Sequence, residues 1–204
     1  GRAMSRSGCR FRSQVAASAA LAACLLLRPA LSLASTAGVP APVRADARSD
    51  LPTDDAARVL AWVNQSGDNA GLPFLIIDKV QAKVFAFYGD GRLRGAAPAL
   101  LGMAYGDTTV SGIGDRELSN IKPEERTTPA GRFVAALGRD LDKEVLWIDY
   151  GAAVSLHRVI TSNPKEHRLQ RLATATPLDN RISYGCVNVP AAYFDSVVRP
   201  TFAG

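Results

Sequence analysis

The sequence is poor in the side chains that most often act as nucleophiles or bases near neutral pH. Its 204 residues include two histidines, His157 and His167, and three cysteines. No cysteines have the paired spacing of a zinc ribbon or finger, which excludes that class of metal module. Chemistry of the thiol or imidazole kind therefore depends on very few candidates.

Acidic residues are absent from the first 45 positions, whereas six of the 24 basic side chains lie there. The rest of the chain holds the remaining 18 basic residues and all 19 acidic ones. Its net charge is therefore −1, although the whole chain carries +5. The basic surplus belongs to the N-terminal segment. We expect no nucleic-acid partner, because a balanced body has no general electrostatic footprint for phosphate backbones.

The N-terminal segment has the layout of a secretory signal. Arginines precede an uncharged apolar run, Val15–Leu27, and small residues follow. Thirteen apolar residues are too few to cross a bilayer comfortably. We therefore predict a signal peptide over residues 1–34 and location in the periplasm or cell envelope, with membrane contact only through this segment. An uncleaved anchor is the alternative. Lipid attachment at Cys24 is disfavoured, because Leu25–Leu27 continue the apolar run beyond it.

An Ala/Pro/Ser-rich stretch, residues 35–52, predicts a flexible linker before a folded domain over residues 53–204. Thr53 is the expected N-cap of a helix over Asp54–Gln65. Strand patterns dominate the remainder, with a hairpin turn at Asp90-Gly91 and a helix over Pro190–Val198. The strands are expected at Leu72–Asp78, Ala82–Tyr88, Arg92–Leu101, Gly131–Leu137, Glu144–Asp149 and Ala153–Ile160. This pattern predicts a mainly β fold, a β-sandwich or partly open barrel with small peripheral helices.

Cys186 is the only cysteine after the N-terminal segment. A lone thiol in an exported protein forms an intermolecular bridge, packs as a small apolar side chain, or reacts. Gly185 lets the backbone approach an electrophile closely. The helix expected from Pro190 predicts a lowered thiol pKa through its dipole and free N–H groups. Arg181 is expected to add positive potential.

Two motifs resemble one family. The run Ser183-Tyr184-Gly185-Cys186-Val187-Asn188 is similar to the Ser/Thr-His-Gly-Cys-apolar-Asn/Arg signature of L,D-transpeptidase (YkuD-like) catalytic domains. Thr128-Pro129-Ala130-Gly131-Arg132-Phe133 is similar to the Thr-Pro-x-Gly-x-Phe motif of the same family. The resemblance covers about residues 72–198 and implies the fold of those catalytic domains.

This resemblance implies roles for individual residues. Cys186 would be the nucleophile and His157 the base, held by a backbone carbonyl at Arg158. The resemblance also implies that the backbone amides near Tyr184, Gly185 and Cys186 bind an oxyanion. It gives Ser183 and Asn188 contacts that bind substrate or order the loop. No metal or cofactor is required in this scheme.

The chain departs from the family in two places. Tyr184 occupies the position of the motif histidine, and a phenol does not act as an imidazole near neutral pH. His157 lies 29 residues before Cys186, longer than the family interval, whereas His167 lies 19 residues before it. The apolar strand pattern around His157 favours it over His167, which lies in a charged segment. Thr161–Pro177 is then an insertion near the mouth of the site.

The implied function is an exported L,D-transpeptidase of cell-wall synthesis. Its partners would be the tetrapeptide stems of peptidoglycan, with a second stem or a wall-anchored protein as the acceptor of the acyl group. Two alternatives use the same fold: an L,D-carboxypeptidase, if water is the acceptor, and a catalytically inert wall-binding module. A papain-like protease fits less well, because here histidine precedes cysteine and strands lead to the thiol.

Overall fold

The computed structural model describes residues 43–44 and 51–203, which lie in one folded unit. The predicted signal peptide, Cys24 within it, and most of the predicted linker lie outside the described residues. Among the residues described, no helix is both long and apolar enough to cross a membrane.

Three β-sheets form the framework of the fold and most of the helices are short, so the mainly β prediction is confirmed. The strands are β1 (Val43–Arg44), β2 (Phe74–Asp78), β3 (Lys83–Phe87), β4 (Leu93–Pro98), β5 (Leu101–Gly102), β6 (Ala136–Asp140), β7 (Lys143–Asp149), β8 (Val154–Arg158), β9 (Arg181–Ser183) and β10 (Val187–Val189). The helices are α1 (Asp54–Ser66), α2 (Arg168–Ala173), α3 (Ala191–Tyr193), the π-helix η6 (Phe194–Val198) and α4 (Arg199–Phe202). Short 3-10 turns are η1 (Ile113–Asp115), η2 (Leu118–Asn120), η3 (Pro123–Glu125), η4 (Pro164–Glu166) and η5 (Pro177–Asn180). The sheets have the orders β1-β4-β3-β2, β10-β8-β7-β6 and β5-β9.

Helix α1 begins as its capping residue predicts. Thr53 has an extended backbone and its side chain accepts a hydrogen bond from the N–H of Ala56. Gly67 ends the helix in the left-handed conformation, at φ 66°. Ala56 packs against the outer face of β2 and β3, where Ile76 and Phe85 are buried. This second, smaller core buries the apolar side of α1 only in part, since Trp62 in α1 remains half exposed.

The hairpin predicted at Asp90-Gly91 is confirmed. Tyr88 N–H donates to Arg92 O at 2.9 Å, which closes the turn between β3 and β4. The preceding turn, between β2 and β3, depends on the buried Asp78, whose carboxylate accepts from the N–H groups of Thr53, Val80 and Gln81. One carboxylate therefore fixes both a strand connection and the start of α1.

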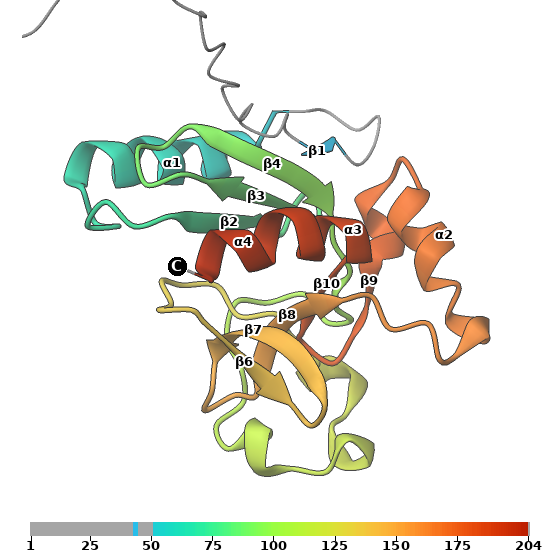
Figure 1. Cartoon of the computed structure of the whole chain (residues 1–204). Helices are drawn as coiled ribbons and strands as arrows, with labels where there is room; N and C mark the ends of the chain where they lie inside the picture. Colours follow the sequence, from blue (N-terminus) through green and yellow to red (C-terminus); the bar gives the residue numbers. More distant parts are fainter. Residues whose placement is uncertain (1–42, 45–50, 204) are drawn as a thin grey trace, which may run out of the picture. The chain divides into compact units, whose positions relative to one another are not determined.

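The main core lies between the two four-stranded sheets, where the C-terminal helical run from α3 to α4 also packs (Figure 1). Tyr193 is 1% exposed, and its hydroxyl lies 3.3 Å from Val84 O and 3.2 Å from Gly95 O, on β3 and β4. The helical run therefore attaches to the first sheet by a polar contact as well as by apolar burial. The fully buried apolar residues of the second sheet in this core are Leu146, Leu156, Val187 and Val189.

Three local expectations differ from the structure. The strand predicted at Gly131–Leu137 begins only at Ala136, because the segment after Pro129 is irregular and Gly131 has φ 149°. The element that directly follows Cys186 is the strand β10, and the predicted helix begins at Ala191 and continues to Phe202. Within the predicted linker, Val43–Arg44 form β1, which pairs in parallel with β4.

Candidate active site

Cys186 lies in a tight turn between two parallel strand pairs. β9 pairs with β5 on one side of the turn, and β10 pairs with β8 on the other. Leu100 connects the two regions, because its N–H and C=O exchange hydrogen bonds with Asn188 at 2.8 and 2.9 Å. The backbone on both sides of the thiol is therefore fixed by sheet hydrogen bonds.

Strand alternation separates the reactive side chains from the core. In the β8–β10 pair, Leu156 lies opposite Val187 and His157 lies opposite Asn188. Leu156 and Val187 are in the core, so His157 and Asn188 point to the other face. Cys186 is two residues before Asn188 and shares that face. The sulfur of Cys186 lies beside Ser155, which is two residues before His157 in β8.

The sulfur of Cys186 has two polar neighbours, both from the start of β8. The Ser155 hydroxyl donates towards Sγ at 3.8 Å, and the thiol donates to Ala153 O at 3.6 Å. Cys186 is partly exposed and is not sealed in the interior. In the part of the chain that the structure describes, no hydrogen bond joins Sγ to a histidine. The resting thiol proton is thus directed to a carbonyl.

Burial raises the pKa of the Cys186 thiol, and the hydrogen bonds from Ser155 act in the opposite direction. The lowered pKa expected from the sequence depended on a helix after Cys186. Because β10 follows instead, and the next helix starts only at Ala191, that helix does not begin at the sulfur. The resting residue is therefore a neutral thiol.

His157 is oriented as a base would be. Its Nδ1 lies 2.7 Å from Arg158 O, where it donates its proton, so Nε2 is the unprotonated acceptor. Burial lowers the pKa of His157, and the hydrogen bond to Arg158 opposes this effect. The imidazole is thus neutral near pH 7 and able to accept a proton. The carbonyl contact that the family resemblance implied is present.

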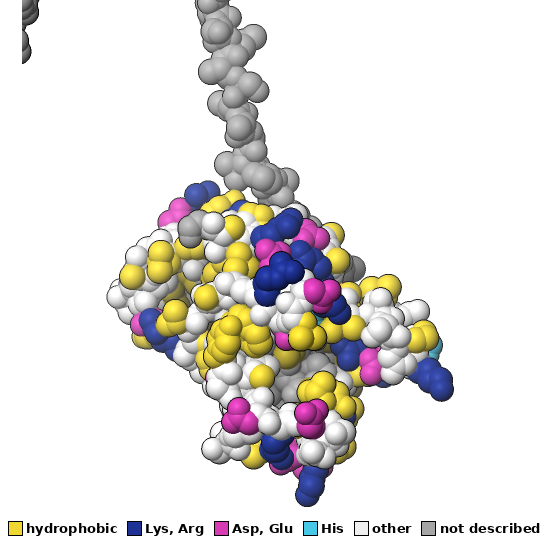
Figure 2. Space-filling view, turned by 60° about the horizontal axis from the view of Figure 1, so that its bottom comes forward, with side chains coloured by type: hydrophobic (Ala, Val, Ile, Leu, Met, Phe, Trp, Pro, Cys, Tyr) yellow, Lys and Arg dark blue, Asp and Glu magenta, His cyan; other side chains and the backbone are white. Residues whose placement is uncertain are grey.

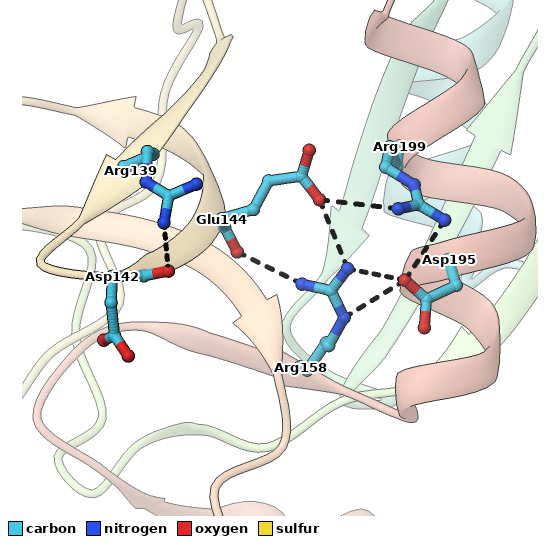
Figure 3. A network of polar contacts seen from close by, with 6 residues as sticks. All are labelled: Arg139, Asp142, Glu144, Arg158, Asp195 and Arg199. Carbon is cyan, nitrogen blue, oxygen red and sulfur yellow. Dashed lines mark hydrogen bonds and ion pairs between the residues drawn. The ribbon is translucent and has the colours of Figure 1, made fainter.

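The side chain of Arg158 anchors the strand that carries this carbonyl. Its guanidinium donates to Asp195 Oδ1 at 2.5 and 3.1 Å and to the Glu144 side chain at 3.2 Å (Figure 3). It also lies 4.3 Å above the ring of Phe194. Arg199 joins the same two carboxylates. The network ties the end of β8 to β7 and to η6, which limits movement of the His157 backbone.

Ser183 and Asn188 hold the backbone of Cys186. The Ser183 hydroxyl donates to Cys186 O at 2.6 Å, and the Asn188 amide donates to the same oxygen at 3.3 Å. Both side chains are buried, at 3% and 1% exposed. They are therefore loop-ordering residues, one of the two roles that the resemblance left open. Gly185 N–H also donates to Ser183 Oγ, at 3.1 Å, so this amide is not available to an oxyanion in the resting state.

Gly185 is required by the geometry of the turn. Its φ is 133°, and a Cβ at this position would lie 2.9 Å from Thr127 O. The Thr128 hydroxyl donates to Gly185 O and accepts from Gly102 N–H, both at 2.8 Å. Thr128, which is 2% exposed, thereby links the Thr-Pro motif, β5 and the cysteine turn.

Tyr184 and Arg181 point away from the sulfur. The Tyr184 ring is 37% exposed and lies under the guanidinium of Arg126 at 3.9 Å. Arg181 donates to Lys79 O at 2.7 Å and covers the ring of Tyr105. It lines a separate hollow of about 470 Å³ beside the β2–β3 turn. The positive potential that Arg181 was expected to supply to the thiol is therefore not found, because its side chain is used elsewhere.

His167 is exposed and lies outside the face that carries Cys186. It has a left-handed backbone, at φ 50°, and precedes α2. Its neighbour Arg168, however, reaches the site and donates to Asn188 Oδ1 at 2.8 Å. The insertion over Thr161–Pro177 thus supplies an arginine, and β8 supplies the imidazole.

Sequence reasoning missed three contributors. Ser155 follows the same alternation as His157, so its position two residues earlier was a usable signal. Thr128 was part of a quoted motif but had no role assigned. Arg168 has no local signal, because its place depends on how the insertion folds against β10.

The described residues contain no group of three or more His, Cys, Asp and Glu side chains that could hold a metal ion. On the face shown in Figure 2, Lys and Arg side chains are interspersed with Asp and Glu and form no continuous basic surface.

Comparisons with known proteins give this chain no relative: no family model, no curated protein and no solved structure matches it.

Proposed function

We propose that this protein is an exported L,D-transpeptidase that acts on the tetrapeptide stems of peptidoglycan through an acyl-thioester on Cys186. One observation carries the proposal: a partly exposed thiol and an imidazole with a free Nε2 share one face of the β8–β10 pair, and Arg158 O orients the imidazole. The motif resemblance at Ser183–Asn188 and Thr128–Phe133 supports the substrate class and the finer fold, the one of L,D-transpeptidase catalytic domains.

The chemistry begins from neutral groups. Sγ attacks the carbonyl carbon of the diaminopimelate residue while the thiol proton passes to His157 Nε2. The C–N bond then breaks, the imidazolium returns its proton to the departing amine, and D-alanine leaves. An amine of a second stem, or of a wall-anchored protein, attacks the thioester and its proton passes to His157. The amide forms and the thiol is regenerated by that proton, so no group is left over and no cofactor takes part.

Attack requires the thiol to leave Ala153 O and approach the imidazole. Ser155, which already donates towards Sγ, is placed to stabilise the sulfur as negative charge develops on it. The raised pKa of the thiol disfavours loss of this proton before attack.

The test is to incubate the protein with disaccharide tetrapeptides and to identify the products by mass. We expect loss of D-alanine and dimers joined through diaminopimelate. Loss of D-alanine without dimers would identify an L,D-carboxypeptidase that uses the same residues with water. Cys186→Ala must abolish either reaction, and His157→Ala must reduce it, whereas His167→Ala is the matched control that should leave it unchanged.

An inert wall-binding module is the second candidate. The observation that favours it is the thiol hydrogen bond to Ala153 O in place of a contact with His157. Binding of the tetrapeptide without any Cys186-dependent product would support this candidate and reject the enzyme.

A further inference from the structure

Arg168 enters the candidate site from the segment between β8 and β9. It is the first residue of α2, and its side chain is only 11% exposed. Its Nη1 donates to Asn188 Oδ1 at 2.8 Å. Asn188 lies opposite His157 in the strand pair and donates to Cys186 O. The guanidinium is thus one side chain away from both groups that react.

The charge of Arg168 reaches both groups. It lowers the pKa of the Cys186 thiol and of the His157 imidazole, whereas Asp140 on β6 raises both. Glu166 pairs with Arg168 at 2.5 Å. The two groups thus feel a cationic and an anionic side chain that have opposite effects on their pKa values.

Two contacts hold the guanidinium and leave donors unused. Nε donates to Glu166 and Nη1 to Asn188, which uses two of the five N–H groups of the side chain. No described residue accepts from Nη2. A partly buried arginine fixed at two points, with an unused edge, matches a carboxylate, because the planar guanidinium can bind both carboxylate oxygens without reordering.

We propose that Arg168 forms a carboxylate subsite beside Cys186, which binds the free terminal carboxylate of the residue that leaves when the thiol attacks. This assignment rests on the proposed function and deepens it: the enzyme would select donor stems that end one residue beyond the attacked carbonyl. Longer stems and stems with a blocked terminus would place no carboxylate at this distance. Selection of the donor then comes from the insertion over Thr161–Pro177, and not from the motif around the thiol.

The first test uses two alkylating reagents of nearly equal size, iodoacetate and iodoacetamide, which differ by one negative charge. Both reagents alkylate the same sulfur. A change in the pKa or exposure of the thiol therefore alters both rates alike and leaves their ratio unchanged. We expect Arg168→Met to lower the iodoacetate-to-iodoacetamide ratio about tenfold, as loss of one charge-assisted contact implies. Arg168→Lys keeps the charge and should retain part of the ratio.

Arg171→Met is the matched control. Arg171 is in the same helix and holds the segment through Glu166 O and Asp179 O, and it has no contact with Asn188. The iodoacetate-to-iodoacetamide rate ratio of Arg171→Met should stay within about twofold of the wild-type ratio. An unchanged ratio in Arg168→Met, or an equal fall in Arg171→Met, would overturn the proposal. Should Arg168→Met not fold, Arg168→Gln takes its place.

The second test compares a tetrapeptide stem with the same stem carrying a terminal carboxamide. The wild type should prefer the free acid, and Arg168→Met should lose that preference while still turning over the amide. If the wild type turns over neither stem, the proposed function fails, and the alkylation ratio still decides whether Arg168 binds carboxylates. If the wild type and Arg168→Met show the same preference for the free acid over the carboxamide, the subsite is wrong and the enzyme assignment stands.

Discussion

Replacing Thr128 by valine should destabilise the protein and disturb the cysteine turn while leaving the volume of the side chain nearly unchanged. The Thr128 hydroxyl makes two hydrogen bonds of 2.8 Å, to Gly102 N–H and to Gly185 O, and the side chain is 2% exposed. Valine would leave a buried donor and a buried acceptor without partners. Each costs about 1–3 kcal/mol, so we expect a loss of about 2–4 kcal/mol in the free energy of unfolding after partial relaxation.

Urea denaturation measures this loss. With a slope of about 2 kcal/mol per molar urea, the midpoint should fall by about 1–2 M. Thr127→Val is the matched control, because Thr127 is also buried, at 6% exposed, and its hydroxyl has no hydrogen bond among the described residues. Equal midpoints for the two variants would refute the view that Thr128 ties the turn to β5. We also expect a change in the alkylation rate of Cys186 in Thr128→Val alone.

Two further predictions concern the thiol and its turn. Because burial raises the pKa of Cys186, the iodoacetamide rate plotted against pH should have its midpoint above that of a free cysteine measured alongside; a midpoint at or below it would contradict the neutral resting thiol. Gly185→Ala adds a Cβ at φ 133° and 2.9 Å from Thr127 O, so it should cost about 2–4 kcal/mol in urea denaturation. Gly112→Ala, at φ 69° with open space around the added Cβ, should lower the free energy of unfolding by only about 1 kcal/mol. An equal loss in Gly185→Ala and Gly112→Ala would show that the contact with Thr127 is harmless.

Local sequence signals predicted many of the elements correctly. The helix after Thr53 and the hairpin at Asp90-Gly91 depend on a cap and a turn, which involve residues close in sequence. The strand predicted at Gly131 was wrong in position, because its start is set by pairing with β7 and not by its own β propensity. The same reason explains β10: Val187–Val189 is a strand because it pairs with β8, and no feature of the short segment announces that partner.

The candidate site, like the fold, could be predicted from the sequence only in part. By itself the sequence determined which side chains could react, since one cysteine and two histidines remain after the N-terminal segment. Only the tertiary structure decided that His157 shares a face with Cys186, that Arg181 turns towards Lys79, and that burial raises the thiol pKa. The physical reason is that residue chemistry is local, whereas orientation, burial and electrostatic environment come from strands and loops that are distant in sequence.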